Sequence, residues 1–171
     1  MTANEDIPTS RTTVEHVALR TGLIYEALVD ALERELGKLD PAVVEKLVAQ
    51  KAPWSEVERE VGRMAGLRGL MIIFRADQGA ITSLAGTAKR SSLYIVGNSV
   101  IANEIIGVDL RASFYVPFRL CVYDDGAPGG AVIAYDRPSS LLDGLKRPEL
   151  RKFGELLDRK IDDLVRELCR A

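Results

Sequence analysis

Residues 112–123 alternate between two kinds of side chain in a way that predicts an extended strand. Large apolar residues occupy every second position, and Arg119 lies among the positions between them. Since the side chains of a strand point alternately to its two faces, one face of this strand is expected to meet a core. The Gly-rich segment 125–130 and the apolar run 131–135 follow, which predicts an antiparallel hairpin. The inward series is Phe114, Val116, Phe118, Leu120 and Val122, and the outward series is Tyr115, Pro117, Arg119, Cys121 and Tyr123.

Three earlier segments also predict strands. Residues 12–19 are rich in Thr and Val, residues 70–74 form a continuous apolar run, and residues 93–96 form a shorter one. The polar segment 75–90, which lies between the last two, predicts no definite element.

Helices are predicted from apolar residues spaced three and four apart. The first follows Thr21 as a candidate N-cap and stops at Gly37. Asp40 and Pro41 are expected to start the second helix, and Ser55 to cap the third. Ser99 is expected to cap a short helix, and the last helix starts at Pro148 with apolar positions Leu150, Phe153, Leu157, Ile161, Leu164 and Leu168.

The predicted order is strand, helix, helical insertion, four strands, helix. Consecutive strands with short connections favour an antiparallel sheet, and helices of this length must cover one of its faces. We therefore predict an α+β two-layer sandwich. Residues 12–171 form one domain with a helical insertion at about 37–66, and residues 1–11 form a mobile tail.

Composition excludes several classes of partner. The net charge of −2 gives no electrostatic reason to expect nucleic acid or an anionic membrane. No apolar run approaches the ~20 residues that span a bilayer. Residues 1–11 lack the features of a secretory signal, so a cytoplasmic protein is expected, with Cys121 and Cys169 as reduced thiols.

Polar clusters close three of the predicted strands, at 97–99, 124–126 and 136–140. The first cluster can be explained as a tight turn with Gly97 at positive φ and a side chain that caps the following helix. The last can be explained by Asp136, whose carboxylate would accept hydrogen bonds from the N–H groups that follow it. The first and the last cluster could instead take part in a ligand site, in which backbone N–H groups at 97–99 bind an anion, or Arg137 and the two serines hold a ligand at the rim of a pocket. The candidate ligand-binding residues are Asn98, Ser99, Arg119, Tyr135, Asp136, Arg137, Ser139 and Ser140.

Arg119 is the most informative of these candidates. A guanidinium in the middle of a strand needs a carboxylate, backbone carbonyls, solvent or an anionic ligand. An ion pair with Asp136 or Glu104 is one explanation, and contact with a ligand is the other. Counting outward from the turn places Arg119 opposite about Tyr135, which predicts a polar site shared with the 136–140 segment.

The order of elements and the polar clusters together resemble the bacterial "domain of unknown function 302" family, from about Thr12 to Leu168. The features that carry the resemblance are Tyr94-Ile-Val-Gly97-Asn98, Tyr115-Val-Pro117, Val122-Tyr123-Asp124-Asp125 and Tyr135-Asp136-Arg137-Pro138. Ser99 stands where the family often has proline. The resemblance implies a fold like that of the TATA-box-binding protein, a dimer, and no established reaction. A shared fold carries no implication of DNA binding.

The leading functional hypothesis is a non-catalytic domain that binds a small molecule, possibly an anionic one, or a protein partner. The alternatives are an enzyme that uses Arg119, Asp136 and Glu104 for acid–base chemistry, and a structural or assembly protein. His16 is the only histidine and the two cysteines lie far apart, so neither a metal nor a cofactor is expected. The apolar stripe of the last helix and the helices of the insertion favour a homodimer.

Overall fold

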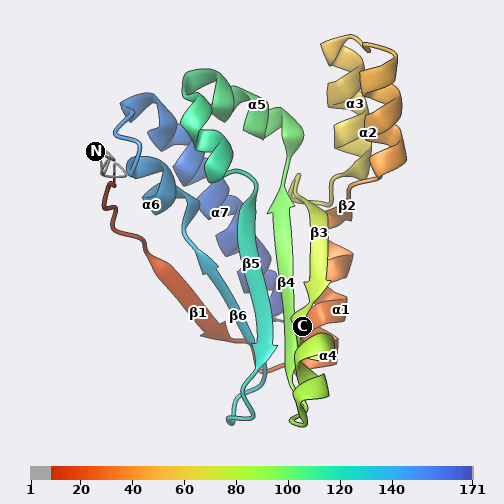
Figure 1. The fold of residues 1–171 in the computed structure, drawn as a ribbon, viewed down its shortest axis with the longest axis vertical. Helices are drawn as coiled ribbons and strands as arrows, with labels where there is room; N and C mark the ends of the chain where they lie inside the picture. The colour runs from red at the N-terminus through yellow and green to blue at the C-terminus, as the bar shows by residue number, and fades with distance from the viewer. Residues whose placement is uncertain (1–8, 171) are drawn as a thin grey trace, which may run out of the picture.

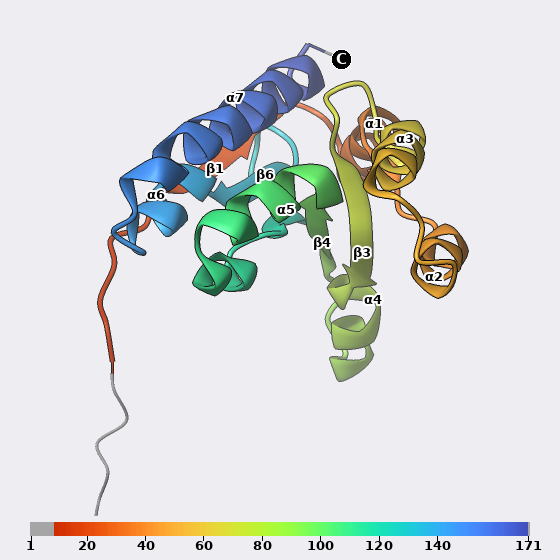
Figure 2. The ribbon, with the colours of Figure 1, turned by 90° about the horizontal axis from the view of Figure 1, so that it is seen from above.

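The six strands form a single sheet, and the helices α1 (Tyr25–Glu35) and α7 (Arg151–Leu168) cover one side of it (Figures 1 and 2). This computed structural model describes residues 9–170, and it confirms the predicted α+β two-layer sandwich. The strand order is β1-β6-β5-β4-β3-β2. The strands are β1 (His16–Arg20), β2 (Gly37–Lys38), β3 (Met71–Asp77), β4 (Arg90–Gly97), β5 (Phe118–Asp124) and β6 (Val132–Asp136).

Neighbouring strands pair antiparallel everywhere except at one edge. There β2, a strand that the sequence analysis missed, pairs parallel to β3. The expectation of a wholly antiparallel sheet is therefore wrong at that edge. The helices are α1 (Tyr25–Glu35), α2 (Pro41–Ala49), α3 (Trp54–Met64), α4 (Gln78–Thr82), α5 (Ser99–Val108), α6 (Pro138–Asp143) and α7 (Arg151–Leu168), with 3-10 turns η1 (Ser83–Ala85), η2 (Leu110–Phe114) and η3 (Pro148–Leu150).

The predicted hairpin is β5 and β6, although β5 is shorter than the alternating pattern. It begins at Phe118, because residues 110–114 coil into η2. The Asp109 side chain stabilises this turn by accepting a hydrogen bond from Arg111 N at 3.0 Å. From Phe118 onward the prediction is confirmed: Phe118, Leu120 and Val122 are buried beneath the helices.

At the other edge of the sheet, β1 covers His16–Arg20 rather than 12–19 and pairs antiparallel to β6. Residues 9–15, which precede it, form neither helix nor strand. Residues 1–8 lie outside the described part of the chain, and so does most of the predicted mobile tail.

The predicted helix caps were partly right. Asp40 caps α2 by accepting a hydrogen bond from Ala42 N at 2.9 Å, as predicted. Ser55 does not cap α3, which begins one residue earlier, at Trp54. Thr21 does not cap α1 either, because α1 begins only at Tyr25 and Ile24 is its N-cap residue. The Thr21 hydroxyl donates to Ala131 O at 3.0 Å.

The hairpin of α2 and α3 leaves the sheet and returns to it through a narrow neck (Figure 1). A Cβ on Gly37 would lie 1.8 Å from Met64 O, and a Cβ on Gly66 would lie 2.2 Å from Glu35 O. The two chain segments are therefore in backbone contact, which only glycine allows at these positions.

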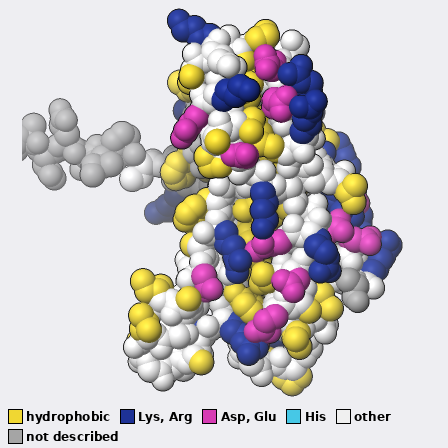
Figure 3. All heavy atoms as spheres, turned by 90° about the vertical axis from the view of Figure 1, so that its right-hand side faces the viewer, with side chains coloured by type: hydrophobic (Ala, Val, Ile, Leu, Met, Phe, Trp, Pro, Cys, Tyr) yellow, Lys and Arg dark blue, Asp and Glu magenta, His cyan; other side chains and the backbone are white. Residues whose placement is uncertain are grey.

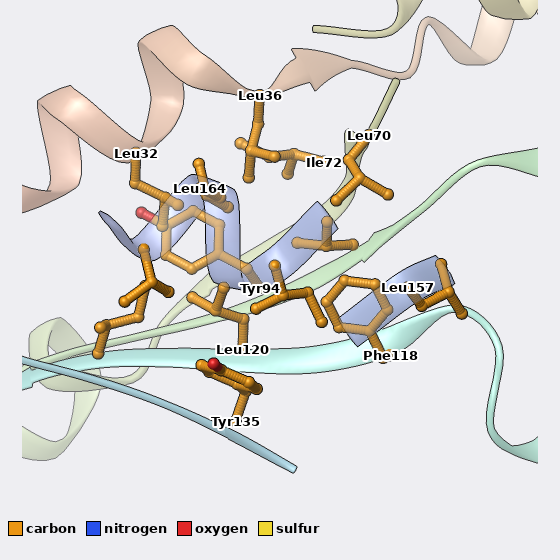
Figure 4. Close-up of a cluster of buried hydrophobic side chains, with 14 of the residues drawn as sticks. Leu32, Leu36, Leu70, Ile72, Tyr94, Phe118, Leu120, Tyr135, Leu157 and Leu164 are labelled. Atoms are coloured by element: carbon orange, nitrogen blue, oxygen red, sulfur yellow. The ribbon is translucent and has the colours of Figure 1, made fainter. Parts of the chain in front are cut away.

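The core lies between the sheet and the layer formed by α1 and α7 (Figure 4). Leu157, Ile161 and Leu164 of α7 are buried there against residues of the sheet such as Leu120 and Tyr94. The apolar stripe of α7 is therefore used within this chain, so it does not support the homodimer that was predicted from it. Within residues 9–170, no helix has both the length and the apolar character needed to cross a bilayer.

Candidate functional site

One face of the sheet carries no helical layer; we call it the open face, and it is turned toward the viewer in Figure 1. Strand alternation places Arg119 and Cys121 of β5 on this face, because their neighbours Leu120 and Val122 point into the core. On β6, Ala134 and Asp136 lie on the open face for the same reason.

Three polar side chains meet at one end of the open face. Arg119 Nη2 lies 3.6 Å from Asp136 Oδ2, and His16 Nδ1 lies 2.9 Å from Asp136 Oδ1. The guanidinium and the imidazole therefore approach different oxygens of one carboxylate. The Arg119 side chain is 72% exposed, whereas the Asp136 side chain is only 27% exposed.

These side chains border a concavity of about 180 Å³, which we call the Arg119 hollow. Its floor is apolar, since Leu93, Cys121 and Ala134 lie between the polar groups. A second and larger concavity of about 430 Å³, the Phe114 hollow, is lined by Ile95, Phe114, Tyr115, Pro117 and Leu141 and shares Arg119 with the first.

The structure divides the residues that were predicted to share one site with Arg119. Asp136 lies beside it, but Tyr135, Arg137 and Ser139 turn toward the helices on the other side of the sheet. Arg137 Nη1 lies 3.2 Å from Asp162 Oδ1, and the Tyr135 hydroxyl donates to the same oxygen at 3.3 Å. Burial, and then the neighbouring Asp162 carboxylate, raise the pKa of Tyr135 to about 12.

Ser139 and Ser140 take structural parts in this second group. Asp158 accepts hydrogen bonds from Ser139 N at 3.1 Å and from its hydroxyl at 2.6 Å, and so caps α6 from α7. The Ser140 hydroxyl donates to Arg137 O at 2.8 Å and accepts from Glu15 N at 3.0 Å. With these partners in place, the 137–140 segment offers little to a ligand.

Asp136 also differs from its predicted structural role. The N–H of Arg137 donates to Glu15 O at 2.8 Å rather than to the Asp136 carboxylate, which is left to His16 and Arg119.

Asn98 and Ser99 lie at the start of α5, away from Arg119. Asn98 caps α5, not Ser99, by accepting from Val100 N at 2.8 Å and Ile101 N at 3.2 Å. These N–H groups therefore have a protein partner and do not form an open anion site. Gly97 does not have positive φ; its lack of a Cβ instead allows close approach, because a Cβ there would lie 2.9 Å from Pro117 Cβ.

Sequence reasoning set aside one important residue and missed two others. His16 was treated as an isolated imidazole, yet strand pairing places it directly opposite Asp136. Asp158 and Asp162, which hold the 135–139 segment, received no attention. Their spacing of four on a helix with a buried stripe was the only signal, since it places both carboxylates on one side of α7.

The side chains of the Arg119 hollow can perform only a few kinds of chemistry. Arg119 can bind an oxyanion, and His16, held at Nδ1 by Asp136, can exchange a proton at Nε2. Glu104 is exposed on α5 and lines neither hollow, so the three residues of the proposed acid–base set do not converge. Among residues 9–170, no three His, Cys, Asp or Glu side chains cluster in a way that could hold a metal ion.

Fold and site define an α+β domain with a helical layer on one face of its sheet and a polar hollow on the other. The chain belongs to the DUF302 family, a domain of unknown function, whose family model matches residues 45–168. A solved structure of similar fold is the uncharacterized conserved protein DUF302 from Bacillus stearothermophilus. The two chains are 15% identical with a TM-score of 0.62, and the match covers 91% of this chain and 98% of that one. No curated protein matches this sequence.

Proposed function

We propose that this domain binds a small molecule that carries a carboxylate or phosphate group, at the Arg119 hollow. One observation carries the proposal: Arg119 projects from an otherwise largely apolar part of the sheet face and donates no hydrogen bond within residues 9–170. A guanidinium presents five N–H donors in a planar fork that fits the two oxygens of such a group.

The neighbours of Arg119 suit this role. Its one carboxylate partner, Asp136, lies 3.6 Å away and is already bound by His16, so an incoming oxyanion can take over the donors of Arg119 without leaving Asp136 unpaired. The apolar floor supplied by Leu93 and Ala134 favours a ligand with a short hydrocarbon part.

Acid–base catalysis is the second candidate, and the hydrogen bond between His16 and Asp136 is what favours it. A carboxylate at Nδ1 fixes the orientation of an imidazole and leaves Nε2 available to a substrate, as in many general bases. Binding without reaction stays the leading proposal, because the thiol on the floor of the hollow, that of Cys121, shares a hydrogen bond with the Ser91 hydroxyl at 3.8 Å rather than with His16.

Titration calorimetry with inorganic phosphate and with short-chain carboxylates tests the proposal. We expect binding by the unmodified protein and loss of at least tenfold in affinity in Arg119→Ala. The matched control is Arg151→Ala, which removes an arginine that is 78% exposed on α7 and should leave binding unchanged. Equal affinity in all three proteins, or no binding by any of them, would contradict the proposal.

A homodimer, or another protein partner, remains a proposal as well. The open face is the surface that supports it, now that the α7 stripe is accounted for within the chain. We also propose the cytoplasm as its compartment, because both Cys121 and Cys169 are free thiols.

A further inference from the structure

The α2–α3 hairpin, which forms the helical insertion, borders a groove of about 320 Å³ that we call the Trp54 groove. It shares no lining residue with the Arg119 hollow or with the Phe114 hollow, so it is a separate candidate site. Apolar side chains of both helices form its walls: Val44, Leu47 and Val48 of α2, and Trp54, Val57 and Val61 of α3.

The sequence of α3 explains why this side of the hairpin is apolar. Trp54, Val57 and Val61 are three and four residues apart, which places them on one side of the helix. Glu60 lies on another side, where its Oε1 is 3.1 Å from Arg63 Nη1. Figure 3 shows charged side chains of both signs over the hairpin, at the top of the picture. The hairpin thus turns its charged residues to solvent and its apolar residues to the groove.

Part of the groove is open to water. Leu47 and Val61 are buried, but Trp54 is 44% exposed and Val48 is 72% exposed. A concavity with apolar walls is the usual form of a small-molecule pocket. Exposed apolar surface that is gathered in such a concavity indicates that an apolar group occupies it.

Lys51 has an unusual backbone conformation at one end of the groove. It follows the C-cap residue of α2 and has a φ of 48°, in the left-handed region. Ala52 N donates to Leu47 O at 3.0 Å, and Lys51 N donates to Val48 O at 3.1 Å. This pair of hydrogen bonds defines a helix ending that usually has glycine where Lys51 stands. Because a lysine backbone is less stable than glycine in this conformation, a use for its side chain is expected.

The charge and the length of the groove describe its ligand. The Lys51 side chain makes no ion pair within residues 9–170, so its ammonium is free to meet an anion at the groove. The groove runs from Lys51, in the turn between the helices, to Met64 at the end of α3. Since α2 beside it has nine residues, its length is about 13 Å.

We propose that the Trp54 groove binds a free carboxylic acid with an alkyl chain of medium length. The chain lies between α2 and α3, and the carboxylate meets the Lys51 ammonium. A single cation at the end of an apolar groove is complementary to a ligand with one anionic group and a hydrocarbon body. This site and its ligand do not depend on the proposed function at Arg119.

The dimensions favour a small molecule over a protein segment. The volume of about 320 Å³ lies at the lower end of the range for small-molecule pockets, roughly 300–1,000 Å³. A helix of a protein partner is about 10–12 Å across with its side chains, which is too wide for this groove. Ser99, at the start of α5, also lines the groove and limits its width on the side of the sheet.

The fluorescence of Trp54 tests the proposal directly, because Trp54 is the only tryptophan of the chain. The probe is decanoate, used below the concentration at which it forms micelles. We expect the emission to shift to shorter wavelength, because the alkyl chain displaces water from the half-exposed indole. Decanol, which has the same chain without the charge, should bind at least fivefold more weakly.

A first pair of variants tests the alkyl chain. Val48→Glu places a carboxylate in the groove and should abolish the shift. Ile81→Glu is the matched control, because Ile81 is 70% exposed on α4 and lines none of the three concavities. It should respond to decanoate as the unmodified protein does. Circular dichroism verifies that each variant is folded.

A second pair tests the anion. Lys51→Met should weaken decanoate binding at least fivefold and leave decanol binding unchanged, whereas Lys46→Met, which changes an exposed lysine of α2 outside the groove, should alter neither. Lys51→Gly should lose the same affinity without any loss of stability in urea, because glycine suits a φ of 48°. A merely structural role of Lys51 would not separate affinity from stability in this way.

Three results would overturn the proposal: no shift with decanoate in the unmodified protein, an equal shift in Val48→Glu, or equal decanoate affinity in Lys51→Met and Lys46→Met. A shift with an amphipathic helical peptide in place of decanoate would assign the groove to a protein partner and overturn it as well. Arg119→Ala should respond to decanoate like the unmodified protein. Phosphate binding that depends on Arg119, without any decanoate shift, would keep the proposed function and reject this site; the reverse pattern would do the opposite.

Discussion

Arg119 of β5 and Asp136 of β6 lie side by side on the open face, with Nη2 and Oδ2 3.6 Å apart. Because Arg119 is 72% exposed, solvent screens this pair, and exposed ion pairs contribute ~0–1 kcal/mol. We expect Arg119→Ala to lower the free energy of unfolding by less than about 1 kcal/mol, since Asp136 keeps His16 as a partner. Urea denaturation checks this; a loss above ~2 kcal/mol would mean that Arg119 holds the fold rather than a ligand.

Asp158 should matter much more to stability than other acids of α7. Its carboxylate accepts two hydrogen bonds from Ser139 and is only 16% exposed, so Asp158→Ala leaves the start of α6 without its acceptor. We expect a loss of about 1–3 kcal/mol. Asp163→Ala is the control, because Asp163 is 61% exposed and should change stability by less than ~0.5 kcal/mol. Equal losses in the two variants would contradict the capping role.

Asn98 and Ser99 provide a second contrast between neighbours. Asn98 accepts from two N–H groups of α5 and donates to Gly69 O at 2.8 Å, which ties α5 to the segment before β3. We expect Asn98→Ala to cost about 1–2 kcal/mol and Ser99→Ala much less, as measured by thermal unfolding. Asn98→Asp keeps the cap but loses the bond to Gly69, so it should lie between them.

Acid should weaken the pairing between the end of β1 and the β5–β6 turn. The hydrogen bonds from Arg20, and then from Ala127 N, lower the pKa of Asp125 from 3.8 to about 2. A carboxyl whose pKa is lowered by folding stabilises the fold above its unfolded value, and this contribution is lost as the pH falls through about 2. Stability should therefore drop between pH 4 and pH 2 less steeply in Asp125→Asn than in the unmodified protein.

A suitable control for the acid series is Glu58→Gln, since Glu58 is exposed and makes no ion pair within residues 9–170. Its pH profile should follow that of the unmodified protein. Parallel profiles for all three proteins would show that Asp125 contributes nothing to acid sensitivity.

Local patterns in the sequence were sufficient to predict the main strands and helices. The alternation at 118–124 and the three- and four-residue spacing of 151–168 each depend on one strand or one helix, and both predictions were confirmed. The register of the β5–β6 hairpin was wrong by one residue. Leu120, rather than Arg119, lies opposite Tyr135, so Arg119 is level with Asp136. Gly126, Gly129 and Gly130 all have positive φ in the turn. The pairing register of two strands cannot be obtained by counting residues across a turn of this kind, because one extra residue shifts it.

The division of the candidate site could not be predicted from local patterns. Asp162, which binds Arg137, and Asp158, which binds Ser139, belong to α7 and lie 25 and 19 residues further along the chain. His16 is 120 residues from Asp136. Such pairs depend on how helices and strands meet in three dimensions. A run of neighbouring polar residues therefore looked like one site, whereas the sheet sends its members to opposite faces.

The glycine neck at Gly37 and Gly66 has a consequence for how this chain can be modified or can diverge. Since backbone meets backbone at these two positions, everything between them leaves and rejoins the sheet at nearly one point. A segment with touching ends can be shortened, exchanged or replaced by a brief turn at little cost in chain entropy. The α2–α3 hairpin is thus a natural place for a graft or a label, remote from the Arg119 hollow.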